Sequence, residues 1–527
     1  MKNLLLALLS GILLAIAWPT YGFPGILFGA FVPLLFAERS LRLSEKRRKT
    51  LRVMGLAYLS FFIWNLITTY WLYFSTPFGM GFAVLVNSLL MSLVFLIYHL
   101  IAKRIPFNAA CVFLVVLWIA FEKLHLQWEF SWPWLNLGNA FSEYTTWIQW
   151  YEYTGTFGGT LWVWLVNMFL FKTILLYRKY REKTIVYRSV LKIGLLVLVP
   201  IFVSLYLLKT YVPGKKSVEV VILQPNIDPY TEKYNTTDER IGILLNDLAE
   251  TSVDQNTDLV LAPETVFADG TRLKQFEFSP AKFYSQELLM GNPGLNFLGG
   301  ISMYSVFSDS SKIRPQTNQL RPGLWYDDYN SAFLMNNTTD SAQFYHKSKL
   351  VVGVENFPYQ AVLKPILGDA MIDLGGTVAM KTTQPNREVF LMDGGTKVAP
   401  IICYESVYGE YVTGYVKNGA QFLTIITNDA WWGNTQGHQQ HLSYARLRAL
   451  ETRRSIARSA NTGISAFINA KGEIVSKLGY EKQGSLKGTI SLNNEKTFYV
   501  RFGDYIARIS MFLALFIFLF AIVRKRK

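Results

Sequence analysis

The sequence is poor in cysteine and histidine, with two cysteines and five histidines among 527 residues. Cys111 lies inside a long apolar segment and Cys403 lies in a later, more polar part of the chain, so a disulfide framework is excluded. His438 and His441 are spaced like half of a metal site, but no H-E-x-x-H motif and no cysteine lies near them. We therefore expect a structural or solvent-facing histidine pair and no bound metal.

Further absences narrow the class of protein. The sequence contains no G-x-x-x-x-G-K-[ST] phosphate loop, no internal repeat and no low-complexity tract, and no cofactor is indicated. Only 17% of residues are charged, whereas 51% are hydrophobic and 15% aromatic, which is too apolar for an ordinary soluble protein. The net charge of +15 comes from basic residues at the ends of apolar segments, where they set membrane orientation, so nucleic-acid binding is not expected.

Eight apolar segments are candidates for membrane spans, at residues 3–17, 24–37, 53–74, 80–102, 108–121, 157–177, 192–211 and 505–523. Several approach the roughly 20 residues that a spanning helix needs. The second and the fifth are shorter, which leaves tilt, partial burial or re-entry open for them. We expect a transmembrane helical domain with seven spans over residues 1–211, and an eighth span with a basic tail over residues 505–527.

Lysine and arginine gather in alternate connections between these segments, around residues 38–52, 103–104 and 178–192 and in the tail 524–527. The opposing short loops at 18–23 and 75–79 contain neither residue. Because basic loops stay in the cytoplasm, both termini are expected there, and the long stretch between the last two spans is expected outside it. A cleavable signal peptide ending at Ala17 is less favoured, since Trp18 and Pro19 make a poor cleavage site.

The outward loop from 122 to 156 is rich in aromatic residues, namely Trp128, Phe130, Trp132, Trp134, Phe141, Tyr144, Trp147, Trp150, Tyr151 and Tyr153. An interfacial aromatic belt and a lipid-binding surface both fit this composition. Both interpretations place the loop at the membrane face, beneath the outer domain.

Residues 212–504 have the composition of an α/β domain. Strand candidates lie at residues 218–224, 258–264, 296–302, 330–335, 398–405, 421–429 and 463–470. Most are near-continuous apolar runs, which is typical of strands covered on both faces. Helix-like stretches between them are clearest at residues 237–251, 406–418 and 437–459.

The strand candidate VAPIICYE, residues 398–405, carries Cys403 toward its carboxyl end, where open α/β sheets keep their chemistry. A free cysteine is most often a small buried hydrophobe, and that interpretation stays open for the residue alone. A lone thiol in an oxidising compartment is a hazard, however, unless it is buried or used in a reaction.

Two charged residues could join Cys403. Glu264 ends the apolar run LVLAPE and Lys347 follows the apparent strand QFYHK, so strand ends could bring all three side chains together. The set suits acyl transfer, because a shielded carboxylate can take the thiol proton while an ammonium and a backbone N–H hold the oxyanion. Taken singly, Glu264 could cap the following segment and Lys347 could lie on the surface.

The motifs together resemble a known family. Pro263-Glu264, the K-x-x-L that begins at Lys347 and the C-Y-E that begins at Cys403 resemble the nitrilase superfamily. With the apolar segments and the motifs NDAWWG, RLRALETRR and RSANTGIS, the whole chain resembles the apolipoprotein N-acyltransferases. The resemblance implies a polytopic α-helical membrane domain plus an α/β outer domain that forms an αββα sandwich.

The resemblance also implies a monomeric enzyme of the bacterial inner membrane, with its catalytic domain on the periplasmic side. A fatty acyl chain passes from a phospholipid, typically phosphatidylethanolamine, to Cys403 as a thioester. It then passes to the α-amine of the diacylglyceryl-cysteine that begins an apolipoprotein. A membrane-anchored amidase that uses water in place of the amine is the alternative, and a transporter or scaffold with an inactive outer domain is a third possibility.

The family's catalytic roles carry over onto matching positions. Glu264 matches the general base, Lys347 the oxyanion stabiliser and Cys403 the nucleophile. Tyr404 and Glu405 match the residues that follow the nucleophile, and the resemblance makes the Tyr404 N–H the second oxyanion donor.

Other matches are less regular. Glu355 matches the acidic residue that assists the triad, although the chain has LVVGVE where the family usually shows L-V-P-x-G-E. The family's aromatic residue after the Q-x-N-I segment is shifted, and Tyr230 and Tyr234 are candidates for it, with Tyr234 preferred.

Two further features concern the substrate. Trp431 and Trp432 could line an acyl pocket or pack in the core. The segment 356–380 holds enough apolar residues to act as a lid or a membrane-dipping arm, or to pack on the core of the outer domain.

Overall fold

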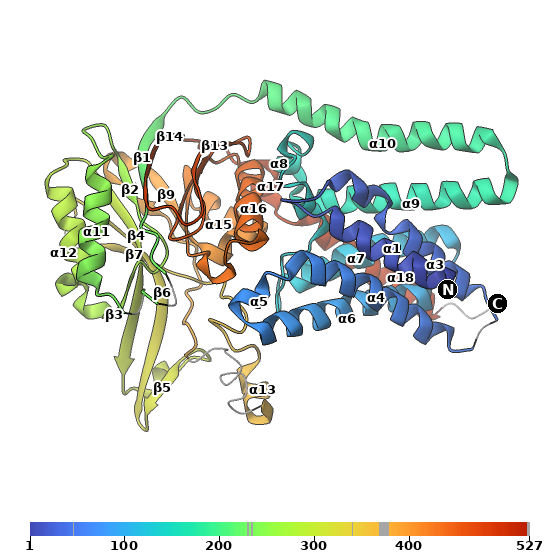
Figure 1. Cartoon of the computed structure of the whole chain (residues 1–527), viewed down its shortest axis with the longest axis horizontal. Helices are drawn as coiled ribbons and strands as arrows, with labels where there is room; N and C mark the ends of the chain where they lie inside the picture. Colours follow the sequence, from blue (N-terminus) through green and yellow to red (C-terminus); the bar gives the residue numbers. More distant parts are fainter. Residues whose placement is uncertain (46, 229–230, 233–234, 340, 368–378, 524–527) are drawn as a thin grey trace. The chain divides into compact units, whose positions relative to one another are not determined.

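The computed structural model describes residues 1–45, 47–228, 231–232, 235–339, 341–367 and 379–523. The chain forms two compact units, which we call the helical unit and the α/β unit (Figure 1). The helical unit comprises Met1–Tyr73, Pro77–Tyr211 and Phe502–Lys527, and the α/β unit comprises Phe74–Thr76 and Val212–Arg501.

The main elements of the helical unit are α1 (Lys2–Ile16), α2 (Leu27–Ala30), α3 (Val32–Arg42), α4 (Lys49–Thr69), α6 (Pro77–Ile101), α7 (Phe107–His125), α9 (Thr156–Tyr180), α10 (Lys183–Thr210) and α18 (Tyr505–Val523). Among the described residues, seven helical stretches are long and apolar enough to cross a membrane, and each overlaps one predicted span. The segment at 3–17 forms α1, whose 15 residues fall short of a hydrocarbon core of roughly 30 Å at about 1.5 Å per residue. A span there stays a prediction.

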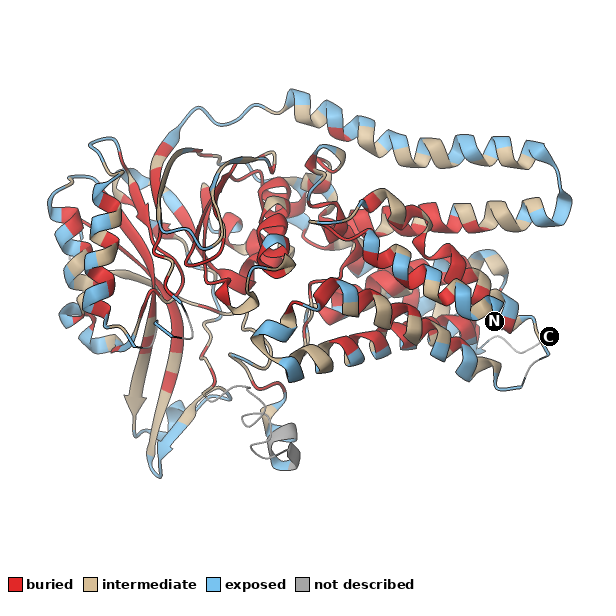
Figure 2. Cartoon of the chain, in the orientation of Figure 1, coloured by how far each residue is buried: buried red, intermediate tan, exposed pale blue. Residues whose placement is uncertain are grey.

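The aromatic loop between α7 and α9 packs largely into the helical unit (Figure 2). Trp134, Phe141 and Tyr151 are buried, and the Phe141 ring stacks on Trp162 of α9 at 5.1 Å between centroids. For these three residues the predictions of an interfacial belt and of a lipid-binding surface are both wrong, because their rings fill the interior between helices. Tyr153 is exposed.

A buried carboxylate ties this loop to the helices. Glu122, near the end of α7, accepts hydrogen bonds from Trp118 Nε1 at 3.0 Å and from the Leu137 N–H at 2.9 Å through Oε1. Its Oε2 accepts from Thr160 Oγ1 on α9 at 2.8 Å. Because a buried carboxylate is stable only when its oxygens are satisfied, these bonds fix the loop at Leu137 against α7 and α9.

Two sheets form the centre of the α/β unit. The eight-stranded sheet contains β1 (Ser217–Gln224), β2 (Leu259–Leu261), β3 (Phe267–Arg272), β4 (Asn296–Phe307), β5 (Asn318–Arg321), β6 (Leu324–Asn336), β7 (Gln343–His346) and β14 (Gly484–Ser491). Its order is β14-β1-β2-β4-β6-β5, with β3 beside β4 and β7 beside β6. β1, β2 and β4 run parallel, so their carboxyl ends meet at one edge.

The second sheet contains β8 (Phe390–Leu391), β9 (Lys397–Ile402), β10 (Phe422–Thr427), β11 (Ile456–Ala460), β12 (Ser465–Ile468) and β13 (Ile474–Leu478). Its order is β13-β12-β11-β10-β9-β8, and β9, β10 and β11 run parallel. All seven predicted strand positions overlap observed strands, since each is a buried apolar run.

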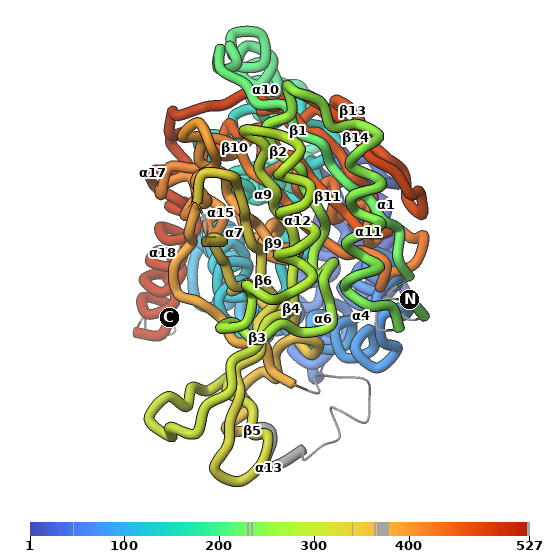
Figure 3. The backbone as a smooth tube through the Cα atoms, turned by 90° about the vertical axis from the view of Figure 1, so that its left-hand side faces the viewer, coloured from blue at the N-terminus to red at the C-terminus, as the bar shows by residue number. Residues whose placement is uncertain are grey.

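Helices cover the outer faces of the two sheets. α11 (Asp238–Glu250) and α12 (Pro280–Met290) cover the eight-stranded sheet (Figure 3). Ile241 and Leu288 on these helices pack in one core with Phe297 and Phe333. α15 (Gly409–Lys417) and α16 (Gln436–Thr452) cover the six-stranded sheet (Figure 1). The α/β unit is therefore an αββα sandwich.

One predicted element ends early. The helix expected at 437–459 is α16, which ends at Thr452, and Arg453 then takes a left-handed conformation with φ of +50°. The residues after it form β11, in which Arg458 is fully buried. The strong helix propensity of the run is overridden because β11 pairs with β10 on one side and β12 on the other.

Candidate active site

Cys403 lies at the carboxyl edge of the second sheet. β9 ends at Ile402, and Cys403 opens the 3-10 turn η7 (Cys403–Val407) with φ of +48°. This left-handed conformation is unfavourable for a residue other than glycine, so surrounding contacts must impose it. A sharp turn directly after a strand is how several enzymes present a nucleophile at a sheet edge.

Lys347, Glu264 and Glu355 form a buried ion cluster. Lys347 directly follows β7, and its Nζ lies 2.9 Å from Glu264 Oε1 and 2.9 Å from Glu355 Oε2. Asn330 on β6 makes a second bridge, because its Nδ2 donates to Glu264 Oε1 at 2.8 Å and to Glu355 Oε1 at 2.9 Å. Glu264 Oε2 accepts from the Asn428 N–H at 3.1 Å. All these donors stabilise the ionised form of the carboxylates.

The charges of the cluster set the state of Lys347 and Cys403. Burial alone would lower the pKa of the Lys347 ammonium, but Glu264, Glu355 and Cys403 raise it well above its usual value. Burial raises the pKa of the Cys403 thiol well above its usual value, and the Glu264 carboxylate adds to the rise, while Lys347 opposes it. At neutral pH the site therefore holds a protonated thiol beside a fixed cation.

This electrostatic state predicts how Cys403 reacts with a small electrophile. In a Cys111→Ala background Cys403 is the only thiol, and its alkylation by iodoacetamide should be slow at pH 7 and still rising above pH 9. The reason is that only the thiolate reacts, and burial with Glu264 disfavours it. Glu264→Gln removes the carboxylate and keeps Lys347, so the increase in the alkylation rate should occur at lower pH. Rates that level off near pH 7 in the parent protein would contradict a protonated resting thiol.

The buried Glu405 carboxylate stabilises the turn η7 and the segments beside it. Its carboxylate accepts from the hydroxyls of Tyr345 at 2.6 Å, Tyr411 at 2.9 Å and Tyr415 at 3.0 Å. It also accepts from the N–H of Ser348 at 2.7 Å and from that of Ile402 at 3.0 Å. Ser348 follows Lys347 and Ile402 precedes Cys403, so this one buried side chain holds the ammonium-bearing and the thiol-bearing segments together.

Glu355 reaches the cluster although its loop departs from the family's usual sequence. Gly353 takes a φ of +79°, and the Val351 N–H donates to Glu355 Oε2 at 2.9 Å. The turn therefore returns the carboxylate to the Lys347 ammonium without the usual proline. Tyr404, the residue after the nucleophile, is buried, and its ring packs edge-on against Tyr408 at 5.3 Å.

The remaining predicted residues lie at the border of the site or outside the described residues. Trp431 and Trp432 are half-buried in a short turn, and the Trp432 ring packs edge-on against the His441 imidazole at 5.6 Å. Tyr230 and Tyr234 lie outside the described residues, as does 368–378 of the predicted lid.

The described part of the predicted lid is mixed in its exposure. Phe357 and Met380 are buried, which fits packing on the core, whereas Tyr359 and Val362 are 39% and 61% exposed. Val362 lies on the short helix α13 (Gln360–Leu367). The exposed side chains leave room for a contact with lipid, and the lid stays a prediction.

Four buried polar residues near Cys403 were not predicted as functional. Asn330 is one, and the others are Asp429, His441 and Arg458. His441 Nδ1 lies 2.9 Å from Asp429 Oδ1, and Arg458 Nη2 donates to Asp429 Oδ2 at 2.5 Å. Burial opposes ionisation of Asp429, but Arg458 and His441 outweigh it and hold the pKa of this carboxyl far below its usual range. The solvent-facing alternative for His438 and His441 is wrong, because both are buried, and His441 Nε2 lies 3.2 Å from the Cys403 carbonyl oxygen.

Potential ligand atoms of Cys403, Asp429 and His441 lie within 4.8 Å of one another, as in a metal site. The donor set does not fit a cation, however. Arg458 Nη2 contacts Asp429 and also lies 3.2 Å from His441 Nδ1, so a fixed positive charge already lies against two of the three groups. Like charges repel strongly in a buried site, so no metal is assigned.

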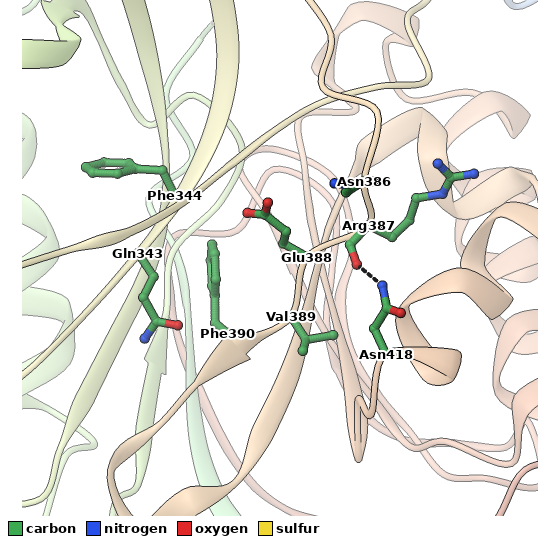
Figure 4. A pocket seen from close by; sticks show the side chains of 8 residues that line it. All are labelled: Gln343, Phe344, Asn386, Arg387, Glu388, Val389, Phe390 and Asn418. Carbon is green, nitrogen blue, oxygen red and sulfur yellow. Dashed lines mark hydrogen bonds between the residues drawn. The ribbon is translucent and has the colours of Figure 1, made fainter.

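A cavity of about 680 Å³ in the α/β unit lies among Gln343, Phe344, Asn386, Arg387, Glu388, Val389, Phe390 and Asn418 (Figure 4). None of these residues belongs to the ion cluster. The cavity touches the site only indirectly, because the Arg387 guanidinium lies 4.4 Å over the ring of Tyr411, which donates to Glu405. We assign no substrate to this cavity.

Comparison with known proteins gives a consistent result for both units. The model of the apolipoprotein N-acyltransferase N-terminal domain matches residues 10–169, and the carbon-nitrogen hydrolase model matches residues 312–498. The apolipoprotein N-acyltransferase of Chlorobaculum tepidum is 28% identical over 100% of this chain and 97% of its own length. That of Geobacter metallireducens is 26% identical over 96% of this chain and 92% of its own. A solved amidase from Nesterenkonia sp. is 15% identical, with a TM-score of 0.37 over 57% of this chain and 98% of its own.

Proposed function

The chain belongs to the apolipoprotein N-acyltransferase family, and on that basis we propose the course of its reaction and the residues that carry it. It is a multi-pass membrane enzyme and an acyltransferase. The donor we propose is a phospholipid such as phosphatidylethanolamine, and the acceptor is the α-amine of the diacylglyceryl-cysteine at the start of an apolipoprotein. Cys403 carries the acyl chain between them as a thioester.

In the first half-reaction Glu264 takes the Cys403 proton as Sγ attacks the ester carbonyl of the phospholipid. The carbonyl carbon becomes tetrahedral, and its oxyanion is stabilised by the Lys347 ammonium and the Tyr404 N–H. The carbon–oxygen ester bond then breaks, and Glu264 returns the proton to the departing lysophospholipid alkoxide. Cys403 is left as a neutral thioester.

In the second half-reaction the acceptor's amine attacks the thioester carbonyl, and Glu264 takes a proton from the attacking nitrogen. The carbon–sulfur bond breaks, an amide forms, and the proton passes to the departing thiolate. Because the same groups bind the oxyanion in both halves, one cluster serves the whole cycle. Glu355 and Glu405 support it, Glu355 through Lys347 and Glu405 through the backbone on either side of the site.

One observation carries this proposal: the Lys347 ammonium bridges Glu264 and Glu355, and both Lys347 and Glu264 act electrostatically on the buried Cys403 thiol. A base, a cation and a nucleophile held in this way suit attack on an acyl carbonyl. The alternative, an amidase that passes the acyl group to water, uses the same cluster. The seven long apolar helical stretches in the described part of the chain favour a lipid donor over a small soluble amide.

The finer assignments are also proposals. We place the enzyme in the bacterial inner membrane as a monomer, with a catalytic domain at residues 212–504 on the periplasmic side, following the asymmetry of the basic loops. We propose that Trp431, Trp432 and Tyr234 contact the lipid chains, and that no cofactor takes part.

Mass spectrometry of the intact protein tests the donor and the intermediate together. After incubation with phosphatidylethanolamine, we expect a mass increase of one fatty acyl chain that hydroxylamine removes and that Cys403→Ala does not show. The reason is that a thioester, unlike an amide, is cleaved by hydroxylamine. Addition of a diacylated lipopeptide should discharge the adduct and produce a triacylated peptide. Free fatty acid without peptide acylation would instead support the amidase.

A further inference from the structure

A buried network joins Asp429, His441 and Ser406 to the backbone carbonyl of Cys403. His441 Nε2 lies 3.0 Å from Ser406 Oγ and 3.2 Å from the Cys403 carbonyl oxygen. Ser406 Oγ itself donates to that carbonyl oxygen at 2.7 Å. All four residues are buried, so these contacts do not compete with water.

Contacts at Nδ1 fix the orientation of the His441 ring. Asp429 Oδ1 lies 2.9 Å from Nδ1 and also accepts from Thr427 Oγ1 at 2.8 Å. Arg458 Nη2 holds the second carboxylate oxygen at 2.5 Å. A carboxylate facing Nδ1 accepts from it, and the Cys403 carbonyl oxygen can only accept, so the hydrogen bonds proposed here place a proton on each ring nitrogen. These contacts hold the ring between the segment that follows β10 and the turn η7 that follows β9.

The geometry of the peptide bond gives these contacts a consequence for the reaction. The bond between Cys403 and Tyr404 is trans and planar, so the Cys403 carbonyl and the Tyr404 N–H point in opposite directions. Contacts that hold the carbonyl oxygen therefore also aim the N–H. Cys403 has a φ of +48°, a conformation that is unfavourable for a residue other than glycine and persists only where neighbours impose it.

We propose that His441 is a positioning residue for the oxyanion site: with Ser406 it holds the Cys403 carbonyl and so directs the Tyr404 N–H at the reacting carbonyl oxygen. This inference rests on the proposed function for the role of the Tyr404 N–H. It separates the two histidines of α16. His438 is equally buried, but its ring stacks on Tyr480 at 4.3 Å and lies 3.3 Å from the Gly433 carbonyl oxygen.

His438 therefore provides a matched control on the same helix. We would compare His441→Leu with His438→Leu, using p-nitrophenyl acetate as the acyl donor and the release of p-nitrophenolate as the readout. This ester acylates a cysteine through an oxyanion but needs neither phospholipid nor lipoprotein. Alkylation by iodoacetamide forms no oxyanion, so its rate reports whether the thiol itself is still accessible and reactive.

In His441→Leu the acylation rate should fall on the order of 10²-fold, because a donor displaced by about 1 Å loses most of its effect. The ester concentration for half-saturation and the alkylation rate should each change by less than about threefold, since ground-state binding and the thiol are retained. His438→Leu should acylate at the parent rate. Ser406→Ala removes only the hydroxyl between the ring and the carbonyl, so its acylation rate should fall less than that of His441→Leu. It replaces His441→Leu in the comparison if that variant does not fold.

An acylation rate in His441→Leu equal to that of the parent protein would overturn the proposal. If His441→Leu does not fold, the same result in Ser406→Ala would overturn it. Equal losses in the two histidine variants, or a matching loss of alkylation, would also overturn it, because they would show general loosening of α16. Failure of the proposed function has a different signature. The parent protein would then react with p-nitrophenyl acetate but form no adduct with phosphatidylethanolamine.

Discussion

Replacement of Cys403 by alanine or serine should abolish acyl transfer, with a loss of at least about 10³-fold, while the protein stays folded. Alanine has no nucleophile. Serine keeps a hydroxyl, but a hydroxyl is far less acidic than a thiol, and burial of the site penalises the anion further. Glu264 is therefore too weak a base to activate serine. Transfer would be followed with a fluorescent phospholipid and a diacylated lipopeptide.

Two measurements separate loss of chemistry from loss of structure. The thermal unfolding midpoint of each variant should stay near that of the parent, since either substitution removes or replaces a single small atom in the core. Cys111→Ala is the matched control, because it removes the other of the two cysteines, and it should transfer at the parent rate. Full activity of Cys403→Ala or Cys403→Ser would mean that another group carries the acyl chain.

The sequence pattern located the strands of the α/β unit because each central strand is a continuous apolar run. β1, β4, β9 and β10 are buried along most of their length, and such runs differ clearly from the charged faces of the helices. Edge strands gave less signal. β13 alternates half-buried and exposed residues and β14 is mostly half-buried, and the hydrophobic pattern alone does not separate such strands from loops.

Residues that approach the site through long-range contacts were harder to predict. Asn330 lies within a predicted strand, and its role follows from contacts with Glu264, 66 residues before it, and Glu355, 25 residues after it. The contact of His441 with the Cys403 carbonyl spans 38 positions. In the sequence His441 resembled half of a metal site, and only packing of α16 beside η7 gives it a partner. The one available signal was local: Asn428 and Asp429 are polar residues directly after a buried strand.

The buried arginine Arg458 shows why the end of α16 was misjudged. Arginine is a good helix former and is seldom buried, so the run around it was interpreted as the charged face of a helix. In the structure its guanidinium is paired with Asp429 and donates from Nη1 to the Ile464 carbonyl oxygen. Charge pairing of this kind depends on the sheet being assembled, and no local pattern encodes it.

Replacement of Lys347 by methionine should lower the rate of acyl-enzyme formation on the order of 10²-fold or more, because the oxyanion loses its only proposed charged donor. Stability should fall as well. Lys347 bridges Glu264 and Glu355, and loss of one partner from a buried ion pair costs about 3–5 kcal/mol. The two carboxylates would then keep Asn330 Nδ2 as a shared donor, together with the Asn428 N–H on Glu264 and the Val351 N–H on Glu355.

Lys349→Met is the matched control for this prediction. Lys349 lies two residues further along and places its ammonium 4.9 Å over the ring of Tyr408, so its loss removes a similar side chain and charge while Lys347 keeps its bonds to Glu264 and Glu355. We expect the rate of acyl-enzyme formation in Lys349→Met to stay within about threefold of the parent rate. The free energy of unfolding should fall by at most about 1 kcal/mol. A near-normal acylation rate in folded Lys347→Met would assign oxyanion stabilisation to a different group.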